Sequence, residues 1–327
     1  MGVSVTTPSD VVNWLLEGPG WVSYRARADL LGESKEKLLP EWKRVAADRE
    51  LQALVQQTSE WPWPKLSSHK SASHPIHKLA FLADLGFDTR EKKLAQLATS
   101  ILDRGSEEGA LRVIVNVSKS YGGSGQDTWA WALCDAPLTA YSLIRMGMGE
   151  EERVRAAVEH LVSLVRDNGW PCAVSKEMGR FRGPGGKNDP CPYANLVMLK
   201  LLAQLPRYRT GSEARIGVEI LLSLWDKSQE RHPYMFYMGT DFRKLKAPFI
   251  WYDIMHVAEV LSQFPYALKD ERMKDMISVI RRKGDARGQF TPESVWTDWR
   301  NWEFGQKKVP SRWLTLCAHR VLARCLD

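Results

Sequence analysis

The stretch PCPYANLVMLKLLAQLP, residues 190–206, is apolar at helical spacing and ends at a proline. Similar apolar segments, most of which end at a glycine or proline, recur along the chain. They are HPIHKLAFLADLG (74–86), DAPLTAYSLIRMG (135–147), WYDIMHVAEVLSQFP (251–265), VPSRWLTLCAHRVL (309–322) and the weaker WVSYRARADLLG (21–32). Internal repetition of this kind is typical of helical repeat proteins.

More charged segments lie between these apolar ones. REKKLAQLATSILD (90–103) and DERMKDMISVIRRK (270–283) have the apolar spacing of amphipathic helices. A hairpin of one apolar and one amphipathic helix cannot bury its apolar face alone, so neighbouring hairpins must stack. We therefore expect an all-α fold, a single α/α toroid of five to six hairpins over residues 1–327, with inner and outer rings of helices. Residues 1–60 are expected to be a less regular part, and an open solenoid is the alternative.

Composition limits the classes of protein to consider. The chain of 327 residues has a net charge of +7 and five cysteines at irregular spacing. An odd number of cysteines without a CxxC pair favours a reducing, cytoplasmic location. The sequence has neither a long apolar run nor a signal-peptide pattern, so no membrane span is expected. The basic balance is compatible with phosphorylated ligands, but nucleic acid is not the partner that we favour.

One stretch carries the sharpest local pattern, GRFRGPGGKNDPCPYAN at residues 179–195. Asp189 and Cys191 stand two residues apart before an expected inner helix, and carboxylate and thiolate are both good zinc ligands. His256, inside another expected inner helix, is the best candidate for a third ligand. Structural roles remain open for all three: a helix N-cap for Asp189, a small buried side chain for Cys191, and a hydrogen-bonded core histidine for His256.

At these residues the chain resembles the β subunits of protein prenyltransferases, and more broadly the squalene-cyclase and prenyltransferase toroid superfamily. The residues that carry the resemblance are Phe181, Arg182, Gly183, Lys187, Asp189, Cys191 and Tyr193. The resemblance implies a zinc cofactor held by Asp189, Cys191 and His256. It also implies that Arg182 and Lys187 grip the diphosphate of an isoprenoid, and that a second, partner subunit completes the enzyme.

Further basic and aromatic residues fit this hypothesis. Arg243 and Lys244 lie in another connector before an inner helix, and we expect all these connectors at one mouth of the ring, where they would add to the diphosphate site. Aromatic side chains would line a central apolar cavity for the isoprenoid tail. They are Trp129, Trp131, Tyr141, Tyr193, Trp251 and Tyr252.

The function predicted from the sequence is therefore that of a prenyltransferase-like or terpenoid-cyclase-like protein that binds an isoprenoid diphosphate. Aspartates that recur near the inner helices, among them Asp135 and Asp253, together with tryptophan platforms, leave a carbohydrate-active or carbohydrate-binding toroid as an alternative. A non-catalytic binding module with a basic rim is another. The group His69, His74 and His77 is compatible with metal binding or with polarity at a helix start. The sequence identifies neither the catalytic residues nor the oligomeric state.

Overall fold

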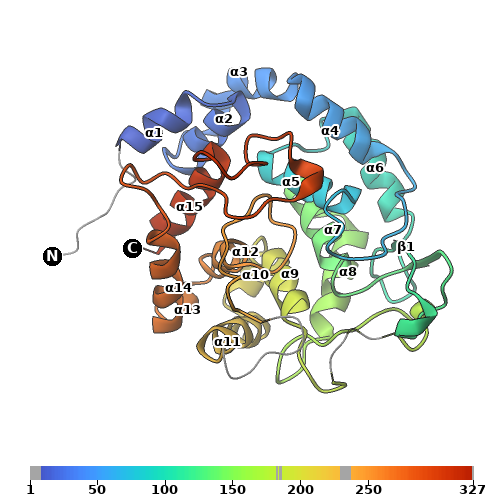
Figure 1. Ribbon diagram of the computed structural model, residues 1–327. Coiled ribbons are helices and arrows are strands. Elements are labelled where there is room, and N and C mark those ends of the chain that lie inside the picture. The colour runs from blue at the N-terminus through green and yellow to red at the C-terminus, as the bar shows by residue number, and fades with distance from the viewer. Residues whose placement is uncertain (1–8, 182, 184–185, 229–236, 326–327) are drawn as a thin grey trace. The chain divides into compact units, whose positions relative to one another are not determined.

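The computed structural model describes residues 9–181, 183, 186–228 and 237–325. The protein is mostly helical, with 15 α-helices and 53% helix in the described part of the chain (Figure 1). Its small antiparallel sheet pairs β1 (Val113–Val115) with β2 (Thr128–Ala130). No helix in the described part is both long and apolar enough to cross a membrane.

The chain divides into two compact units. The middle unit is Leu54–Tyr237, and the terminal unit combines Met1–Ala53 with Met238–Asp327. The boundary at residue 53 falls within α4 (Arg49–Ser59). Residues 9–59, for which the sequence predicted a less regular part, form four helices.

The middle unit is built on three helices that are buried on nearly every side. They are α5 (Pro75–Leu85), α7 (Ala136–Leu143) and α9 (Pro192–Leu202). In Figure 1, α7 lies between α5 and α9 and packs against both. We call these three the inner helices of the middle unit. Their burial explains why these segments are apolar at almost every position, because no face of the helix meets water.

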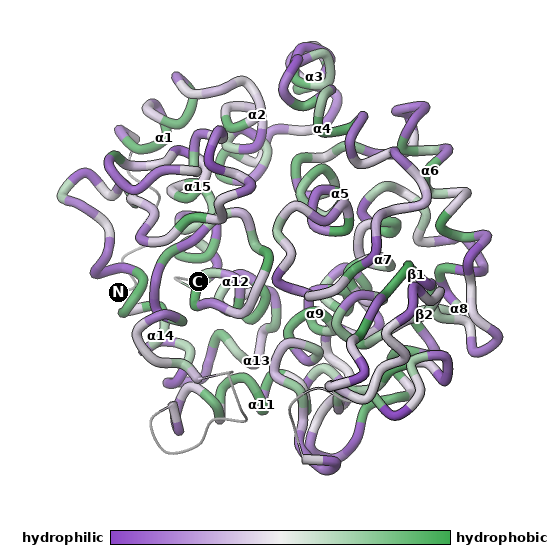
Figure 2. The backbone as a smooth tube through the Cα atoms, turned by 45° about the vertical axis from the view of Figure 1, so that its right-hand side comes forward, coloured by the Kyte–Doolittle hydropathy of each residue, from purple (hydrophilic) through white to green (hydrophobic). Residues whose placement is uncertain are grey.

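A second set of helices buries only one face. In the middle unit these outer helices are α6 (Lys92–Leu102), α8 (Glu152–Ser163) and α11 (Ser212–Asp226). Hydrophobic and hydrophilic residues alternate along α6 and α8 in Figure 2, as expected for helices with one buried face. The remaining short elements of this unit are η1 (Lys119–Tyr121), η2 (Ile144–Met148), η3 (Lys176–Met178) and α10 (Pro206–Arg209).

The terminal unit has the same division of roles. All of α12 (Ile254–Leu261) is buried, and α15 (Arg312–Arg324) is buried over most of its length and packs on α12. The other elements are α1 (Ser9–Leu16), α2 (Gly20–Asp29), α3 (Lys35–Ala46), α13 (Pro265–Leu268), α14 (Glu271–Arg281) and η4 (Thr297–Trp299). Of these, α14 packs against both α12 and α15, while α2 packs against α15.

The structure confirms the helical nature of the sequence repeat. Each of the six apolar segments contains a helix, namely α2, α5, α7, α9, α12 and α15. The charged segments 90–103 and 270–283 form α6 and α14, with one buried face each. The coarse expectation of a mostly helical protein is therefore correct, with the two-stranded sheet as an addition that the sequence analysis did not include.

Each unit contains a buried charge network that joins its helices. In the middle unit, Lys200 of α9 donates to Asp84 of α5 at 3.4 Å, and Tyr141 of α7 donates to the other oxygen of Asp84. In the terminal unit, Arg320 pairs with Asp29 at 3.2 Å and with Glu259 at 3.1 Å. Removing one partner from such a network leaves a buried charge uncompensated, so the networks favour one packing of the helices.

Candidate functional site

Several reactive side chains gather where the inner helices of the middle unit begin. Because each connection between α5, α7 and α9 returns through an outer helix, α6 or α8, the three inner helices run in the same direction and start at the same end. His69 lies shortly before α5, Cys134 and Asp135 directly precede α7, and Cys191 directly precedes α9. Contacts between these residues join the three helix starts into one cluster.

The first contact is an ion pair between His69 and Asp135. The Nδ1 atom of His69 lies 2.6 Å from Oδ1 of Asp135, and the Asp135 side chain is only 2% exposed. By its geometry this contact is an ion pair and not an aligned hydrogen bond. Burial by itself lowers the pKa of His69, but the Asp135 carboxylate outweighs it and raises that pKa above the usual value. His69 is therefore charged over a wider pH range than a free histidine.

A second histidine supports the first. His77 in α5 is 4% exposed, and its Nε2 lies 3.0 Å from the backbone oxygen of His69. A carbonyl can only accept, so Nε2 of His77 carries the proton and donates. Burial lowers the pKa of His77 from 6.5 to about 3, which keeps this ring neutral at ordinary pH. The loop that carries His69 is thus anchored on the first inner helix.

Cys191 occupies the N-cap position of α9 and is half-buried. The next residue, Pro192, has no N–H, so the first free backbone donors of the helix belong to Tyr193 and Ala194. The neighbouring Cys134 thiol, followed by the backbone N–H groups of Ala194 and Tyr193, lowers the pKa of Cys191 despite its burial, and the charge of His69 adds to this effect. A thiol with a low pKa at a helix N-terminus is the usual environment of a reactive cysteine.

The backbone around Cys191 is held by Asn195, which is fully buried. The side-chain amide of Asn195 donates to the carbonyl oxygens of Cys191 at 2.8 Å and Trp170 at 3.0 Å. Its oxygen accepts from the Trp170 backbone N–H at 3.1 Å, and the Cys191 N–H donates to the Trp170 carbonyl at 2.8 Å. Asn195 therefore holds the carbonyl of Cys191, and Trp170 holds its N–H.

Two neighbouring groups differ from Cys191 in their protonation. The neighbouring Cys191 sulfur, followed by burial, raises the pKa of Cys134 well above its usual value. Burial also raises the pKa of Tyr193, which is 0% exposed. Cys172, a third thiol of this region, accepts a hydrogen bond from the Gly183 backbone N–H at 3.0 Å. The cluster thus contains one activated thiol, Cys191, beside a second thiol, Cys134, and a phenol that stay protonated.

The expected zinc ligands do not form a recognisable metal group. In the described part of the chain, no three His, Cys, Asp or Glu side chains are arranged to hold a metal ion. Asp189 and Cys191 belong to the middle unit, and His256 to the terminal unit. Asp189 closes a turn by accepting from the Gly186 N–H at 2.9 Å. The N-cap of α9 is Cys191, so the structural alternative of an N-cap does not apply to Asp189. The zinc site stays a prediction.

His256 fits the structural alternative given for it. It is 1% exposed, its Nδ1 lies 2.9 Å from the Trp251 carbonyl, and its ring stacks on Phe249 with 5.4 Å between centroids. Asp253 caps the same helix through a hydrogen bond of 3.0 Å from the His256 N–H. Burial raises the pKa of Asp253 to about 7, so this carboxyl is protonated in part at neutral pH. His256 is thus a hydrogen-bonded core residue of α12.

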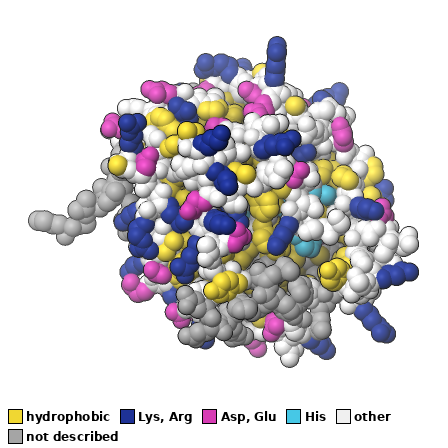
Figure 3. Space-filling view, viewed as in Figure 1, with side chains coloured by type: hydrophobic (Ala, Val, Ile, Leu, Met, Phe, Trp, Pro, Cys, Tyr) yellow, Lys and Arg dark blue, Asp and Glu magenta, His cyan; other side chains and the backbone are white. Residues whose placement is uncertain are grey.

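The expected diphosphate-binding residues are divided between the two units. Arg182 lies outside the described residues, and Lys187 is exposed in the turn before α9. In the terminal unit, Lys244 pairs with Asp241 at 3.2 Å, and Arg243 donates to the Met238 carbonyl at 3.3 Å. On the face that Figure 3 shows, Lys and Arg side chains are scattered, with Asp and Glu among them. Their joint role in binding a diphosphate stays a prediction.

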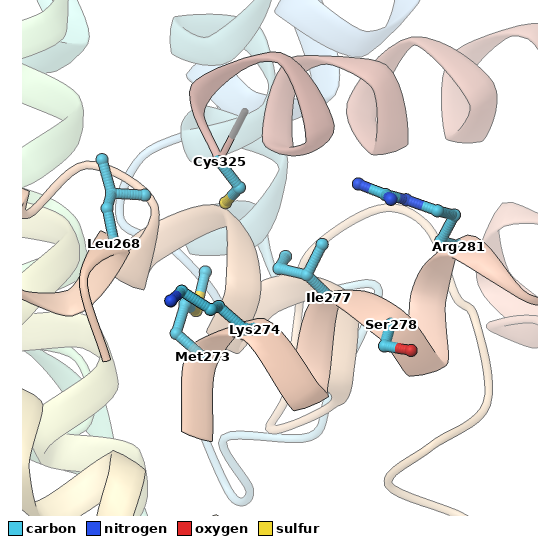
Figure 4. Close-up of a pocket in the computed structure, with 7 residues that line it drawn as sticks. All are labelled: Leu268, Met273, Lys274, Ile277, Ser278, Arg281 and Cys325. Atoms are coloured by element: carbon cyan, nitrogen blue, oxygen red, sulfur yellow. The ribbon is translucent and has the colours of Figure 1, made fainter. Parts of the chain in front are cut away.

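The expected cavity-lining aromatics have varied surroundings. Trp129 lies beneath the guanidinium of Arg104, with 4.6 Å to the ring centroid, and Tyr141 belongs to the buried network around Asp84. Trp131 and Tyr252 are 3% and 5% exposed, Tyr193 is fully buried, and Trp251 is half-buried. A pocket of about 230 Å³ in the terminal unit is lined by none of the six. Figure 4 shows its lining residues, Leu268, Met273, Lys274, Ile277, Ser278, Arg281 and Cys325.

No protein-family model matches this chain, and no curated protein matches it in sequence. The candidate site must therefore be judged on its own geometry. Sequence reasoning named Cys191 for another role and noted His69 and Asp135 only within separate groups. One signal in the sequence could have placed Cys191, His69 and Asp135 together. An aspartate or cysteine recurs just before the inner helices, and repeated helices begin at the same end.

Proposed function

We propose that this protein is an enzyme that transfers or hydrolyses acyl groups through the Cys191 thiolate. The observation that carries the proposal is the geometry at the start of α9. The ring of His69, which pairs with Asp135 at 2.6 Å, lies 6.5 Å between centroids from the ring of Tyr193, two residues after Cys191. Thiol, histidine and carboxylate in this relation are typical of nucleophilic catalysis by cysteine.

Each residue has a distinct role in the proposed reaction. The Cys191 thiolate attacks the carbonyl carbon of an ester, thioester or amide and forms an acyl-thioester. His69 gives its proton to the departing group and then removes a proton from the water or acceptor that releases the acyl group. The Asp135 carboxylate pairs with the Nδ1 side of the His69 ring, so Nε2 is the ring nitrogen assigned to this proton transfer.

The electrostatic environment supports these roles. His69 keeps a positive charge because Asp135 raises its pKa, and that charge favours the Cys191 thiolate. The N–H groups of Tyr193 and Ala194 stabilise the negative sulfur before attack. After attack, donors at the same helix start are suited to the oxyanion of a tetrahedral intermediate, because a helix N-terminus favours negative charge.

The test uses p-nitrophenyl acetate as a probe of acyl transfer. We expect a burst of p-nitrophenol and an acetyl adduct on Cys191, located by mass spectrometry of peptides. Cys191→Ser and His69→Gln should both lose the burst, while Cys325→Ser should keep it. Cys325 is the matched control because it is also half-buried, but burial raises the pKa of its thiol to about 11.

The same samples separate this proposal from zinc-dependent transfer. Zinc content is measured by elemental mass spectrometry on untagged protein prepared without chelator. One result would contradict the proposal: the parent protein contains one zinc per chain and takes no acetyl group, and Cys191→Ser loses the zinc. Cys191 would then be a zinc ligand, as the resemblance implies, and not a nucleophile. An acetyl adduct on metal-free protein would support the nucleophile.

Two finer expectations of the sequence analysis remain proposals. A closed α/α toroid is supported by the alternation of fully buried and one-face-buried helices within each unit. Binding of an isoprenoid diphosphate is supported by Cys191 and Tyr193, which begin α9 as the resemblance implies. Protection of the protein against thermal unfolding by farnesyl diphosphate, and its loss in Lys187→Ala, would test the second.

A further inference from the structure

The terminal unit contains a pocket with no role in the proposed reaction. It lies between α13, α14 and the end of α15 and has a volume of about 230 Å³. We call it the α14 pocket, because this helix supplies five of its lining residues, Met273, Lys274, Ile277, Ser278 and Arg281. Leu268, the last residue of α13, and Cys325, the C-cap of α15, complete it. Ligand pockets usually have about 300–1,000 Å³, so this one suits a small molecule.

One side of the α14 pocket is apolar. Met273 and Ile277 are 1% and 4% exposed, and Leu268 is half-buried. In Figure 4 the Cys325 side chain points from α15 toward α14, where Met273 and Ile277 lie. Burial raises the pKa of this thiol to about 11, so it carries no charge at neutral pH. An apolar group of a ligand would gain free energy by leaving water for this surface.

The other side of the pocket is positively charged. Residues 274, 277, 278 and 281 follow one another at helical spacing and therefore lie on one face of α14. This spacing places the cations Lys274 and Arg281 toward opposite ends of the pocket, with Ile277 between them (Figure 4). Among the described residues, no acidic side chain lines the pocket. The pocket therefore complements a ligand that combines an apolar part with a negative charge.

The two cations differ in how far they are already neutralised. Lys274 pairs with Glu271 at 2.6 Å on the exposed surface of the helix. Arg281 makes no side-chain hydrogen bond or ion pair with another residue in the part of the chain that the structure describes. Helical side chains lean toward the N-terminus of their helix, and Figure 4 shows Arg281 extending back over the pocket. One uncompensated guanidinium is thus directed at the space beside Ile277.

We propose that the α14 pocket binds a small fatty acid. The carboxylate pairs with Arg281, whose planar fork of donors matches the two carboxylate oxygens. The alkyl chain lies against Met273, Ile277 and Leu268, the apolar side of the pocket. The inference does not rest on the proposed function, since none of these residues belongs to the middle unit that contains Cys191.

The charge and the volume define the class of ligand. Because Glu271 offsets Lys274, one positive charge remains, and it matches a carboxylate better than a phosphate group with about two negative charges. The volume of about 230 Å³ limits the alkyl chain to medium length, and octanoate is the probe that we choose. Two related molecules test its two parts separately. The alcohol 1-octanol keeps the chain without the charge, and acetate keeps the charge without the chain.

The experiment measures binding to the full chain by isothermal titration calorimetry. We expect octanoate to bind at one site per chain, at least about tenfold more tightly than 1-octanol or acetate. Arg281→Gln should raise the Kd of octanoate about three- to tenfold, because a charge-assisted pair at a partly solvated position is lost. Arg282→Gln is the matched control and should leave the Kd unchanged. Arg282 is the next residue, donates to Ser278 at 2.6 Å and does not line the pocket.

A second pair of variants tests the apolar side. Cys325→Phe places a ring in the pocket and should abolish binding, whereas Cys325→Ser keeps the size of the side chain and should bind octanoate as the parent chain does. Circular dichroism checks that each variant has folded. If Cys325→Phe does not fold, Arg281→Gln still decides, because residue 281 is exposed.

A spectroscopic signal locates the bound ligand. The chain has ten methionines, and labelling of their methyl groups with ¹³C gives NMR signals in which Met273 is assigned by comparison with Met273→Leu. We expect octanoate to shift the Met273 signal, because this side chain lines the pocket. Acetate at the same concentration should leave the signal in place.

Four outcomes would overturn the inference. They are no binding of octanoate, binding that leaves the Met273 signal unmoved, an equal Kd for Arg281→Gln and the parent chain, or binding of 1-octanol as tight as that of octanoate. The proposed function is tested separately, since an acetyl adduct on Cys191 requires nothing of the α14 pocket.

Discussion

The protonation of His77 predicts how the free energy of unfolding depends on pH. Its ring is buried in α5 and donates to the carbonyl of His69, so it supports the loop that carries the proposed base. The substitution His77→Gln keeps an amide N–H at the place of Nε2 but removes the titration. We therefore expect little change in the free energy of unfolding at pH 7, within about 1 kcal/mol.

The size of the pH effect follows from the pKa of His77 in the folded protein and in the unfolded chain. Burial, with the neighbouring charges of His74, His69 and Lys200, lowers the pKa of His77 from 6.5 to about 3 in the folded protein. Between these values the unfolded chain binds a proton that the folded chain does not. Above pH 6.5, His77 therefore does not reduce the free energy of unfolding. Below pH 6.5, the free energy of unfolding falls by about 1.4 kcal/mol per pH unit because of this group. At pH 4.5 the loss due to His77 is about 2.7 kcal/mol.

The assay is urea denaturation followed by tryptophan fluorescence, at pH 7 and at pH 4.5. Other groups titrate in this range in both proteins, so the quantity of interest is the difference between parent and variant. We expect His77→Gln to gain about 2.7 kcal/mol relative to the parent on going from pH 7 to pH 4.5. His160→Gln is the control, because His160 is half-exposed on the outer helix α8, whereas His77 is 4% exposed.

A result in which His77→Gln and the parent lose stability in parallel between the two pH values would refute this reasoning. It would mean that His77 takes up its proton in the folded state, and that its hydrogen bond to His69 is made differently. An equal gain in His160→Gln would also count against the argument, because burial of the specific ring would no longer explain the effect.

Three further predictions concern the cluster and the core. Asp135→Asn should lower the rate of Cys191 alkylation by iodoacetamide at pH 7, because the neighbouring imidazole loses charge. We expect a decrease of about tenfold, which corresponds to one pKa unit. The control Asp189→Asn, which removes a carboxylate two residues from the thiol, should leave this rate unchanged. Cys325 should remain unlabelled at pH 8 while Cys191 is labelled, because burial raises the pKa of Cys325 to about 11, and peptide mass spectrometry would detect the reverse order. Lys200→Met should lower the free energy of unfolding, measured by urea denaturation, by about 3–5 kcal/mol, since it leaves the buried Asp84 carboxylate without its cation. A decrease below about 1 kcal/mol would show that the Lys200–Asp84 pair is not needed for stability.

The helices could be predicted from the sequence because their signal is local. A segment such as 190–206 is apolar at almost every position, and 90–103 on one face only. These patterns match the inner helix α9 and the outer helix α6. Short-range apolar spacing reports how much of a helix is buried, whatever the neighbours are. The two-stranded sheet was missed because its strands have only three residues each.

The candidate site could be predicted only in part. Cys191 was singled out because of its neighbours in the chain, yet the partners chosen for it were Asp189 and His256. Asp189 turned out to close its own turn with Gly186. The contacts that define the proposed chemistry instead come from residues 69 and 135, far away in the sequence. Spacing along the chain could not reveal them, since it says nothing of which helix starts meet.

The sequence by itself determined the helical repeat, the positions of its buried helices, and the presence of a thiol at the start of one of them. Only the tertiary structure decided which groups surround that thiol. The physical reason is that helix formation and burial depend on residues three and four apart, whereas the pKa of Cys191 depends on charges and donors brought together by the parallel packing of α5, α7 and α9. A local pattern could place the sulfur, but only the packed helices supplied its base.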